Sequence, residues 1–156
     1  MGTSGTQQRN RKAEQMNYTT AIVMMPLVEE PKSTRVTGPK DVYEFCKDLG
    51  ALAQESFQIL TLNGRNKVIN RHMISLGMID CSAACPREMF RAAILDSASG
   101  IICVHNHPTG ETTPSSADIQ TTKQLMEAGK LIGIAVLDHV IVGGENYTSL
   151  KESGLM

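Results

Sequence analysis

The segment GIICVHNHP at residues 100–108 constrains the fold more than any other part of the chain. Its apolar run is short and is bounded by Gly100 and Pro108, a pattern that predicts a buried β-strand. Side chains on a strand alternate between two faces, so His105 and His107 should point the same way. Pro108 cannot continue the sheet pairing and should turn the chain into a loop. A buried strand of this kind needs neighbouring strands and a layer of helices packed against them.

Periodic patterns on both sides of this strand supply those elements. Apolar residues recur at helical spacing over 39–53, 86–98 and 115–128, and Gly129 would end the last of these helices. Asn63-Gly64 between two β-favouring runs predicts a hairpin turn. The predicted strands are at 21–28, 56–62, 67–74, 100–105, 132–138 and 139–144. This order indicates an α/β (α+β) fold, in which a mixed sheet is flanked by helices.

Composition is that of an ordinary globular domain, with 41% hydrophobic and 20% charged residues in a chain of 156. We expect one domain over residues 20–156, preceded by a flexible polar arm at 1–19. The net charge of −1 provides no global field that would attract nucleic acid. No apolar run approaches the ~20 residues that cross a bilayer, and no signal-peptide pattern is visible, which favours a cytoplasmic protein.

The four cysteines are then expected to be thiols. Cys46 falls on the apolar face of a predicted helix and is interpreted as a core residue. Cys103 shares a strand face with the two histidines, but same-face positions lie about 6.5 Å apart, which favours a buried thiol over a ligand. Cys81 and Cys85 lack the second pair that a structural zinc site requires. His72, in a predicted strand, has no evident partner and is interpreted as structural.

The two histidines provide the chemical signal. Two imidazoles on one strand face can hold a divalent metal ion, and Asp118 can return as a third ligand, which leaves a tetrahedral zinc one open position. An isolated His-x-His pair is also common as ordinary polar residues, and Ser115 with Asp118 fits a helix capping box. Capping and ligation are compatible, because the helix would orient a carboxylate on its first turn.

The stretch HNHPTGETTPSSAD at residues 105–118 resembles the metal-binding signature of JAB/MPN metalloproteases, which is His-x-His-Pro, a loop and Ser-x-x-Asp. The chain is similar to the bacterial RadC-like branch of this family from about Thr34 to Met156. The segments that carry the resemblance are QESFQILTLN, PREMFRAAI, VHNHPTGETTPSSADI and LDHVIVGG. Several separated motifs in the correct order are more specific than one short match. The resemblance implies the cytidine-deaminase-like JAB/MPN fold.

The same resemblance implies roles for individual residues. It implies one Zn²⁺ per chain, although iron or manganese would also fit the ligand types. The matching general base is Glu55, which spacing alone would not have selected. Ser115 matches a serine that helps to stabilise the oxyanion of the tetrahedral intermediate, and its role as a helix N-cap is an equal alternative. For His139, a supporting or substrate-contacting role and an ordinary hydrogen-bonded histidine both stay open. The implied metal ligands are His105, His107 and Asp118.

Three functions follow from these expectations. The first is a zinc-dependent hydrolase, a metallopeptidase or isopeptidase acting on a peptide or protein-conjugate substrate, in which Glu55 takes a proton from the attacking water. The second is an accessory role in DNA repair or nucleic-acid processing. The near-neutral charge weighs against it, as does the lack of room for the helix-hairpin-helix region that longer members carry. The third is a non-catalytic binding module. No membrane partner is expected, and the oligomeric state stays open.

Overall fold

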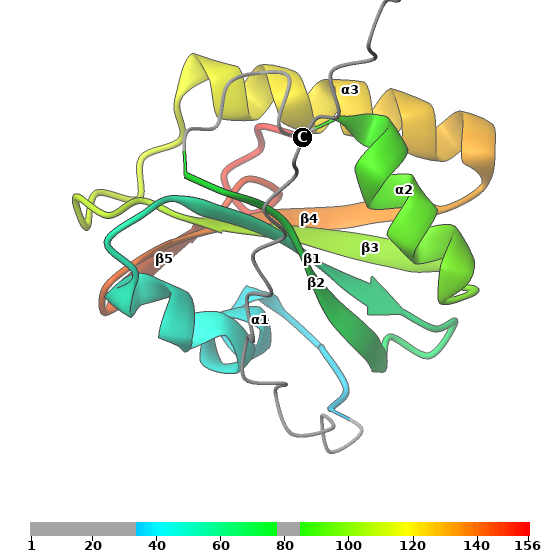
Figure 1. The fold of residues 1–156 in the computed structure, drawn as a ribbon, viewed down its shortest axis with the longest axis horizontal. Helices are drawn as coiled ribbons and strands as arrows, with labels where there is room; N and C mark the ends of the chain where they lie inside the picture. The colour runs from blue at the N-terminus through cyan, green and yellow to red at the C-terminus, as the bar shows by residue number, and fades with distance from the viewer. Residues whose placement is uncertain (1–33, 78–84) are drawn as a thin grey trace, which may run out of the picture.

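The protein is described by a computed structural model that covers residues 34–77 and 85–156 (Figure 1). The helices in these ranges are α1 (Pro39–Cys46), α2 (Pro86–Leu95) and α3 (Ser116–Ile132), with a short 3-10 helix η1 at Lys47–Ala51. The strands are β1 (Ser56–Leu62), β2 (Val68–Leu76), β3 (Gly100–Asn106), β4 (Ala135–Gly143) and β5 (Asn146–Ser149).

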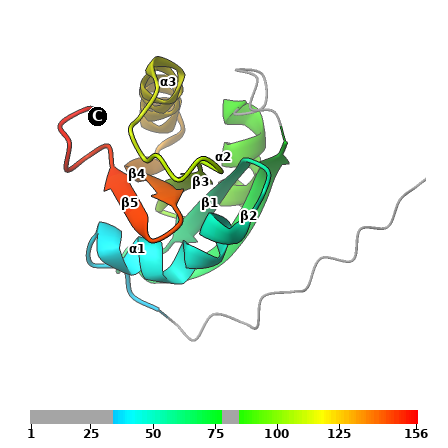
Figure 2. The same ribbon diagram turned by 90° about the vertical axis from the view of Figure 1, so that its left-hand side faces the viewer.

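The strands form one mixed sheet in the order β2-β1-β3-β4-β5. β3 and β4 are parallel and are connected through α3, whereas the other neighbouring pairs are antiparallel. Helix α1 covers one face of the sheet, and α2 and α3 cover the other (Figures 1 and 2). The predicted α/β (α+β) class is therefore confirmed.

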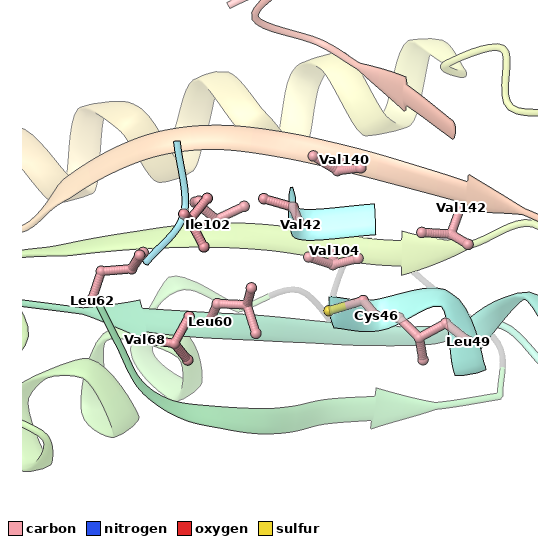
Figure 3. Packing of buried hydrophobic residues seen from close by; sticks show 11 residues of the cluster. Val42, Cys46, Leu49, Leu60, Leu62, Val68, Ile102, Val104, Val140 and Val142 are labelled. Carbon is pink, nitrogen blue, oxygen red and sulfur yellow. The ribbon is translucent and has the colours of Figure 1, made fainter. Parts of the chain in front are cut away.

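β3 is the central strand, and every residue in it is buried. Ile102 and Val104 face α1, whereas Ile101 and Cys103 face α2 and α3. Figure 3 shows the core on the α1 side, where Cys46 packs among aliphatic side chains of the sheet, as predicted. On the other face, Cys103 is fully buried in the core, as predicted, and burial raises its pKa to about 12, so the thiol is neutral.

Helix α3 begins as predicted but ends later. Ser115 and Asp118 form the expected capping box, in which each side chain accepts a hydrogen bond from the backbone N–H of the other. The prediction that Gly129 ends the helix is wrong, because the helix continues to a cap at Gly133, whose φ is 82°. Gly129 is a close-packing position, since a Cβ there would lie 2.5 Å from the carbonyl oxygen of Ile134.

The predicted strands at 132–138 and 139–144 are instead the single strand β4, which contains a β-bulge. Its pairing with β3 shifts between Ile101 and Ile102 and leaves Leu137 as the extra residue. The Asp138 carboxylate accepts a hydrogen bond from the backbone N–H of His139 at 2.7 Å. The two predicted strands are therefore one continuous strand that is interrupted by a bulge.

Two predicted helices end earlier than expected. The helix predicted over 39–53 gives way to η1, where Gly50 packs so closely that a Cβ would lie 2.9 Å from the Gly144 carbonyl oxygen. The helix predicted over 86–98 ends at Leu95, because Ser97 adopts a left-handed backbone with φ 53°. In both cases a tertiary contact or a turn overrides the apolar spacing.

Three expectations lie outside the described residues: the arm at 1–19, the strand at 21–28 and the state of Cys81. Among the helices of 34–77 and 85–156, none combines the length and the apolar character needed to cross a bilayer.

His72 has a partner that the sequence did not reveal. Its Nε2 lies 2.6 Å from Oδ2 of Asp96, at the end of α2. The same carboxylate accepts hydrogen bonds from the Thr61 hydroxyl at 2.6 Å and from the Asn70 amide at 3.0 Å. Burial would raise the pKa of Asp96, but these hydrogen bonds together hold it below its ordinary value. Asp96 therefore fastens α2 to β1 and β2 in its ionised form.

We expect Asp96→Asn to lower the free energy of unfolding by about 1–3 kcal/mol at pH 7, because it removes a partly buried, charge-assisted acceptor. A lowered folded-state pKa stabilises the fold above the ordinary carboxyl pKa of about 4, and this contribution is lost as the pH falls further. The difference in the free energy of unfolding between wild type and Asp96→Asn should therefore become smaller from pH 7 to pH 3, as measured by urea titrations. Glu44→Gln, in an exposed pair with Lys47, should change stability little at either pH. A gap that widens in acid would contradict this account.

Candidate metal centre

The two histidines lie at the carboxyl end of β3, on the face that α2 and α3 cover. His105 is fully buried, and His107 begins the following loop with 18% of its side chain exposed. Their Nε2 atoms are 3.0 Å apart, so the predicted same-face arrangement is present. Asn106 between them turns its side chain the other way, toward residues 52–56. Strand alternation therefore places the imidazoles of His105 and His107 on one face and the amide of Asn106 on the other.

A backbone carbonyl orients His107. Nδ1 of His107 lies 2.7 Å from the carbonyl oxygen of Glu111, and a carbonyl can only accept a hydrogen bond. Nδ1 therefore carries the hydrogen, and Nε2 is the nitrogen that faces His105. The backbone N–H of His107 donates to the carbonyl of Val142 at 2.9 Å, which ties the start of the loop to β4.

Asp118 brings a carboxylate to both imidazoles from the first turn of α3. Its Oδ1 lies 3.4 Å from Nε2 of His105, and its Oδ2 lies 3.6 Å from Nε2 of His107. Oδ2 also accepts hydrogen bonds at 2.7 Å from the backbone N–H and the hydroxyl of Ser115. The capping box therefore aims the carboxylate at the histidines, and Asp118 meets the requirements of both roles considered for it.

Glu55 approaches the same point from the segment before β1. Its Oε1 lies 3.8 Å from Nε2 of His105, and the ligand atoms of Glu55, His105 and His107 all lie within 4.8 Å of one another. The site thus presents two carboxylates, Glu55 and Asp118, to one pair of imidazoles. Either one supplies the oxygen that would complete a three-residue metal site.

Asn106 holds the segment that carries Glu55. Its Oδ1 accepts from the backbone N–H of Ser56 at 2.8 Å, and its amide donates to the carbonyl of Gln54 at 3.1 Å. Asn106 is fully buried, and its two bonds bracket Glu55 on both sides in the sequence. The residue between the two histidines therefore positions the carboxylate that faces them.

The far side of His105 is also occupied. Its Nδ1 lies 2.8 Å from Nε2 of His139, and Nδ1 of His139 lies 2.6 Å from the hydroxyl of Thr122. The ring of Phe57 stacks parallel to the His105 ring with centroids 5.7 Å apart. His139 is buried and lies against the ring of His105, not at the surface. This position agrees with a residue that hydrogen-bonds to His105 and not with one that contacts a substrate.

Burial and neighbouring groups shift the pKa values of the four residues in the cluster. Burial lowers the pKa of His105 to about 4, so its ring is neutral at pH 7. A hydrogen bond with Asp118 raises the pKa of His107. Burial would raise the pKa of Asp118, but the hydrogen bond with His107 and the neighbouring His105 and Ser115 hold it well below its ordinary value. Burial raises the pKa of Glu55, as suits a carboxylate that takes up a proton.

These donors fit a divalent metal ion. Imidazole nitrogens and carboxylate oxygens are the ligands of catalytic zinc sites, and here they converge from β3, α3 and the segment before β1. The carboxylates of Asp118 and Glu55 both lie beside the point where the two Nε2 atoms meet, so the cluster offers negative charge to a cation there. Each histidine also has its other ring nitrogen hydrogen-bonded, as is usual for histidines that bind metals.

A small cavity of about 250 Å³ opens onto this cluster. Its lining includes Glu55, His107, Ser115 and Asp118. A larger cavity of about 470 Å³ lies beside α1 on the other face of the sheet, and its lining contains none of these residues. Glu55, His107, Ser115 and Asp118 therefore share one small opening to solvent.

The structure brings together all of the residues proposed from the sequence. Glu55, His105, His107, Ser115, Asp118 and His139 form one connected cluster. Sequence reasoning missed Asn106, Thr122 and Phe57. Asn106 lies inside the His-x-His motif and Thr122 lies one helical turn after Asp118, so strand alternation and helical spacing were the available signals.

The mixed sheet flanked by helices, the two histidines at the end of its central strand and the Ser-x-x-Asp that starts the next helix are consistent with a JAB domain. The RadC-like JAB domain family matches residues 36–155 of the chain, which therefore belongs to this family. A UPF0758 protein of Caldanaerobacter subterraneus subsp. tengcongensis is 49% identical over 120 residues, which cover 76% of this chain and 52% of the relative.

Two further relatives show the same extent of similarity. A UPF0758 protein of Desulforamulus reducens is 48% identical over 133 residues, or 83% of this chain and 59% of the relative. A UPF0758 protein of Methanosarcina mazei is 41% identical over 130 residues, or 83% of this chain and 56% of the relative. The chain thus spans a little over half the length of the relatives it matches.

We expect Asn106→Ala to lower the free energy of unfolding by about 1–3 kcal/mol, because it leaves a buried N–H and a carbonyl flanking Glu55 without partners. Denaturant unfolding measures this loss. Asn146→Ala, at an exposed position of β5, is the matched control and should change stability by less than about 0.5 kcal/mol. Equal stability of the two variants would show that Asn106 does not hold the Glu55 segment.

Proposed function

We propose that this domain is a zinc-dependent hydrolase that cleaves an amide bond. The observation that carries the proposal is the convergence of two imidazoles with oriented Nε2 atoms, one low-pKa carboxylate and one raised-pKa carboxylate at a single opening. Membership of the RadC-like JAB domain family supports metal-dependent hydrolysis as the general class. The choice of zinc, the bond and the substrate belong to the proposal.

The two carboxylates have different proposed tasks. Asp118 would be the third ligand, because its low pKa keeps it ionised and the Ser115 donors fix its direction. Glu55 would be the general base, because burial raises its pKa and 32% of its side chain is exposed to the opening. When bound, zinc would polarise a substrate carbonyl and lower the pKa of water. Glu55 would accept the proton of the attacking water and return it to the leaving amine.

The hydroxyl of Ser115 is already hydrogen-bonded to Asp118. Its hydroxyl donates to Asp118 at 2.7 Å and accepts from the Asp118 backbone N–H at 3.1 Å. Stabilisation of an oxyanion would require this hydroxyl to turn from Asp118 toward the substrate. We therefore propose that Ser115 acts first as the N-cap that aims Asp118, and that any contact with an oxyanion is made during turnover.

A role in DNA repair or nucleic-acid processing is the second candidate, and a non-catalytic binding module is the third. The net charge of −1 supplies no global field for DNA, so the peptide or protein-conjugate substrate is preferred. Salt-dependent binding of duplex or single-stranded DNA would favour the second candidate. Stoichiometric metal without turnover of either amide or phosphodiester substrates would favour the third.

The metal assignment predicts a contrast between two isosteric variants. Asp118→Asn should lose bound zinc, whereas Glu55→Gln should retain about one zinc per chain, because only the first removes a ligand. Metal analysis of protein purified without added metal measures this, with His107→Ala as a variant expected to lose zinc. Zinc retained in Asp118→Asn but lost in Glu55→Gln would exchange the roles of the two carboxylates. Wild-type protein that binds no zinc after reconstitution would overturn the proposal.

Turnover tests the role of Glu55 separately. In a screen of peptide and isopeptide substrates, Glu55→Gln should reduce kcat by at least about a hundredfold at unchanged zinc content, as expected for removal of a general base. A phosphodiester substrate in the same screen is the control for the nucleic-acid alternative. Full activity in Glu55→Gln would show that another group takes the proton.

A further inference from the structure

A line of buried hydrogen bonds leads from the centre into helix α3. Thr122 Oγ lies 2.6 Å from the carbonyl oxygen of Asp118 and 2.6 Å from Nδ1 of His139. Nε2 of His139 lies 2.8 Å from Nδ1 of His105. Thr122, His139 and His105 are all fully buried, so these contacts are not shared with solvent.

Only one placement of the hydrogen atoms gives each of these contacts one donor and one acceptor. The Asp118 carbonyl can only accept, so the single hydroxyl hydrogen of Thr122 points to it. Thr122 Oγ must then accept from Nδ1–H of His139, which leaves a lone pair on Nε2 of His139 in the neutral ring. That lone pair accepts from Nδ1–H of His105. The remaining nitrogen of His105, Nε2, therefore presents a lone pair to the centre.

Nε2 of His105 therefore offers a lone pair toward His107, whose own Nδ1–H donates to the carbonyl of Glu111. In the metal-free protein, a hydrogen on Nε2 of His107 can be donated to this lone pair across the 3.0 Å between the two atoms. A metal ion would take the place of that hydrogen between the two nitrogens. The reverse arrangement, with a hydrogen on Nε2 of His105, would block that atom as a ligand.

The β-bulge in β4 places the side chain of His139 on the same face of the sheet as His105. Val136 packs in the core on the α2 and α3 side, and strict alternation would turn His139, three residues later, to the α1 side. The extra residue Leu137 shifts the alternation by one and returns His139 to the face of His105. The Asp138 carboxylate, which accepts from the backbone N–H of His139 at 2.7 Å and from the Ser149 hydroxyl, secures the bulge.

We propose that Thr122 and His139 are positioning residues that set the tautomer of His105, with the Asp118 carbonyl as the fixed end of the line. This inference adds detail to the proposed zinc site. It rests on the proposed function, because the tautomer of His105 serves a purpose only if His105 binds a metal ion. The same residue, Asp118, therefore contributes a carboxylate to the metal and a backbone carbonyl that prepares the other ligand. The tautomer itself is a property of the metal-free protein.

The test compares wild type with Thr122→Val, which keeps the shape of the side chain but removes the hydroxyl. Long-range ¹H–¹⁵N correlation spectra of the metal-free protein report which ring nitrogen carries hydrogen. The chain has four histidines, and His72→Gln identifies one remote signal. We expect hydrogen on Nδ1 of both His105 and His139 in wild type, loss of this pattern in Thr122→Val, and a zinc affinity lowered about 10- to 100-fold.

Three controls separate this role from a structural one. Thr122→Ser keeps the hydroxyl and should restore the tautomer and the zinc affinity. Thr61→Val removes another buried hydroxyl, the one bonded to Asp96, and should lower stability without changing either readout. If Thr122→Val does not fold, Thr122→Ala replaces it, since a smaller side chain leaves no clash.

The outcomes are distinct. Hydrogen on Nε2 of His105 in wild type, or an unchanged tautomer and zinc affinity in a folded Thr122→Val variant, would overturn the inference. If wild type binds no zinc, the proposed function fails, whereas the spectra of the metal-free protein still decide whether Thr122 and His139 set the tautomer.

Discussion

The structure depends on a strand that is buried on both faces and yet ends in two polar residues, with a third at the start of the following loop. β3 crosses the middle of the sheet, so its end cannot rely on solvent to satisfy polar groups. Burying such groups without partners is unfavourable by several kcal/mol in total, on the order of 1–3 kcal/mol for each. His105 and Asn106 must therefore find protein partners, and the partly exposed His107 has one as well. Each of the three residues contacts a different part of the chain. The centre is the place where those partners meet.

Helix α3 contributes two residues to the surroundings of the histidines within its first two turns, Asp118 and Thr122. The cap at Ser115 directs the Asp118 carboxylate toward both imidazoles, and the Asp118 carbonyl receives the hydroxyl of Thr122 one turn later. A helix start normally leaves backbone N–H groups that need acceptors, which is why a capping box is favourable on its own. Here the cap and the proposed metal site use the same carboxylate, so the contacts that stabilise the helix start also orient Asp118 toward the histidines.

Much of this arrangement could be predicted from the chain, and the remainder could not for definable reasons. The apolar run of β3, the capping box and the same-face histidines are set by local periodicity, and the structure has them all. The bulge at Leu137 and the continuation of α3 past Gly129 depend on tertiary packing that no local pattern encodes. Glu55 could be selected only through a family resemblance, because its position is decided by Asn106, a residue 51 positions away in the chain.

The two histidines are held in unequal ways, and this inequality follows from where the strand ends. His105 lies in the sheet and is fixed by buried side chains, whereas His107 lies in a loop and is fixed by the Glu111 carbonyl. That loop rests directly on β4, since a Cβ at Gly143 would lie 2.5 Å from the Gly110 carbonyl oxygen. A side chain at Gly143 would therefore push away the loop that orients His107 without touching the line behind His105. The centre thus combines one histidine whose position is set by the core with another whose position is set by the packing of a loop against a glycine.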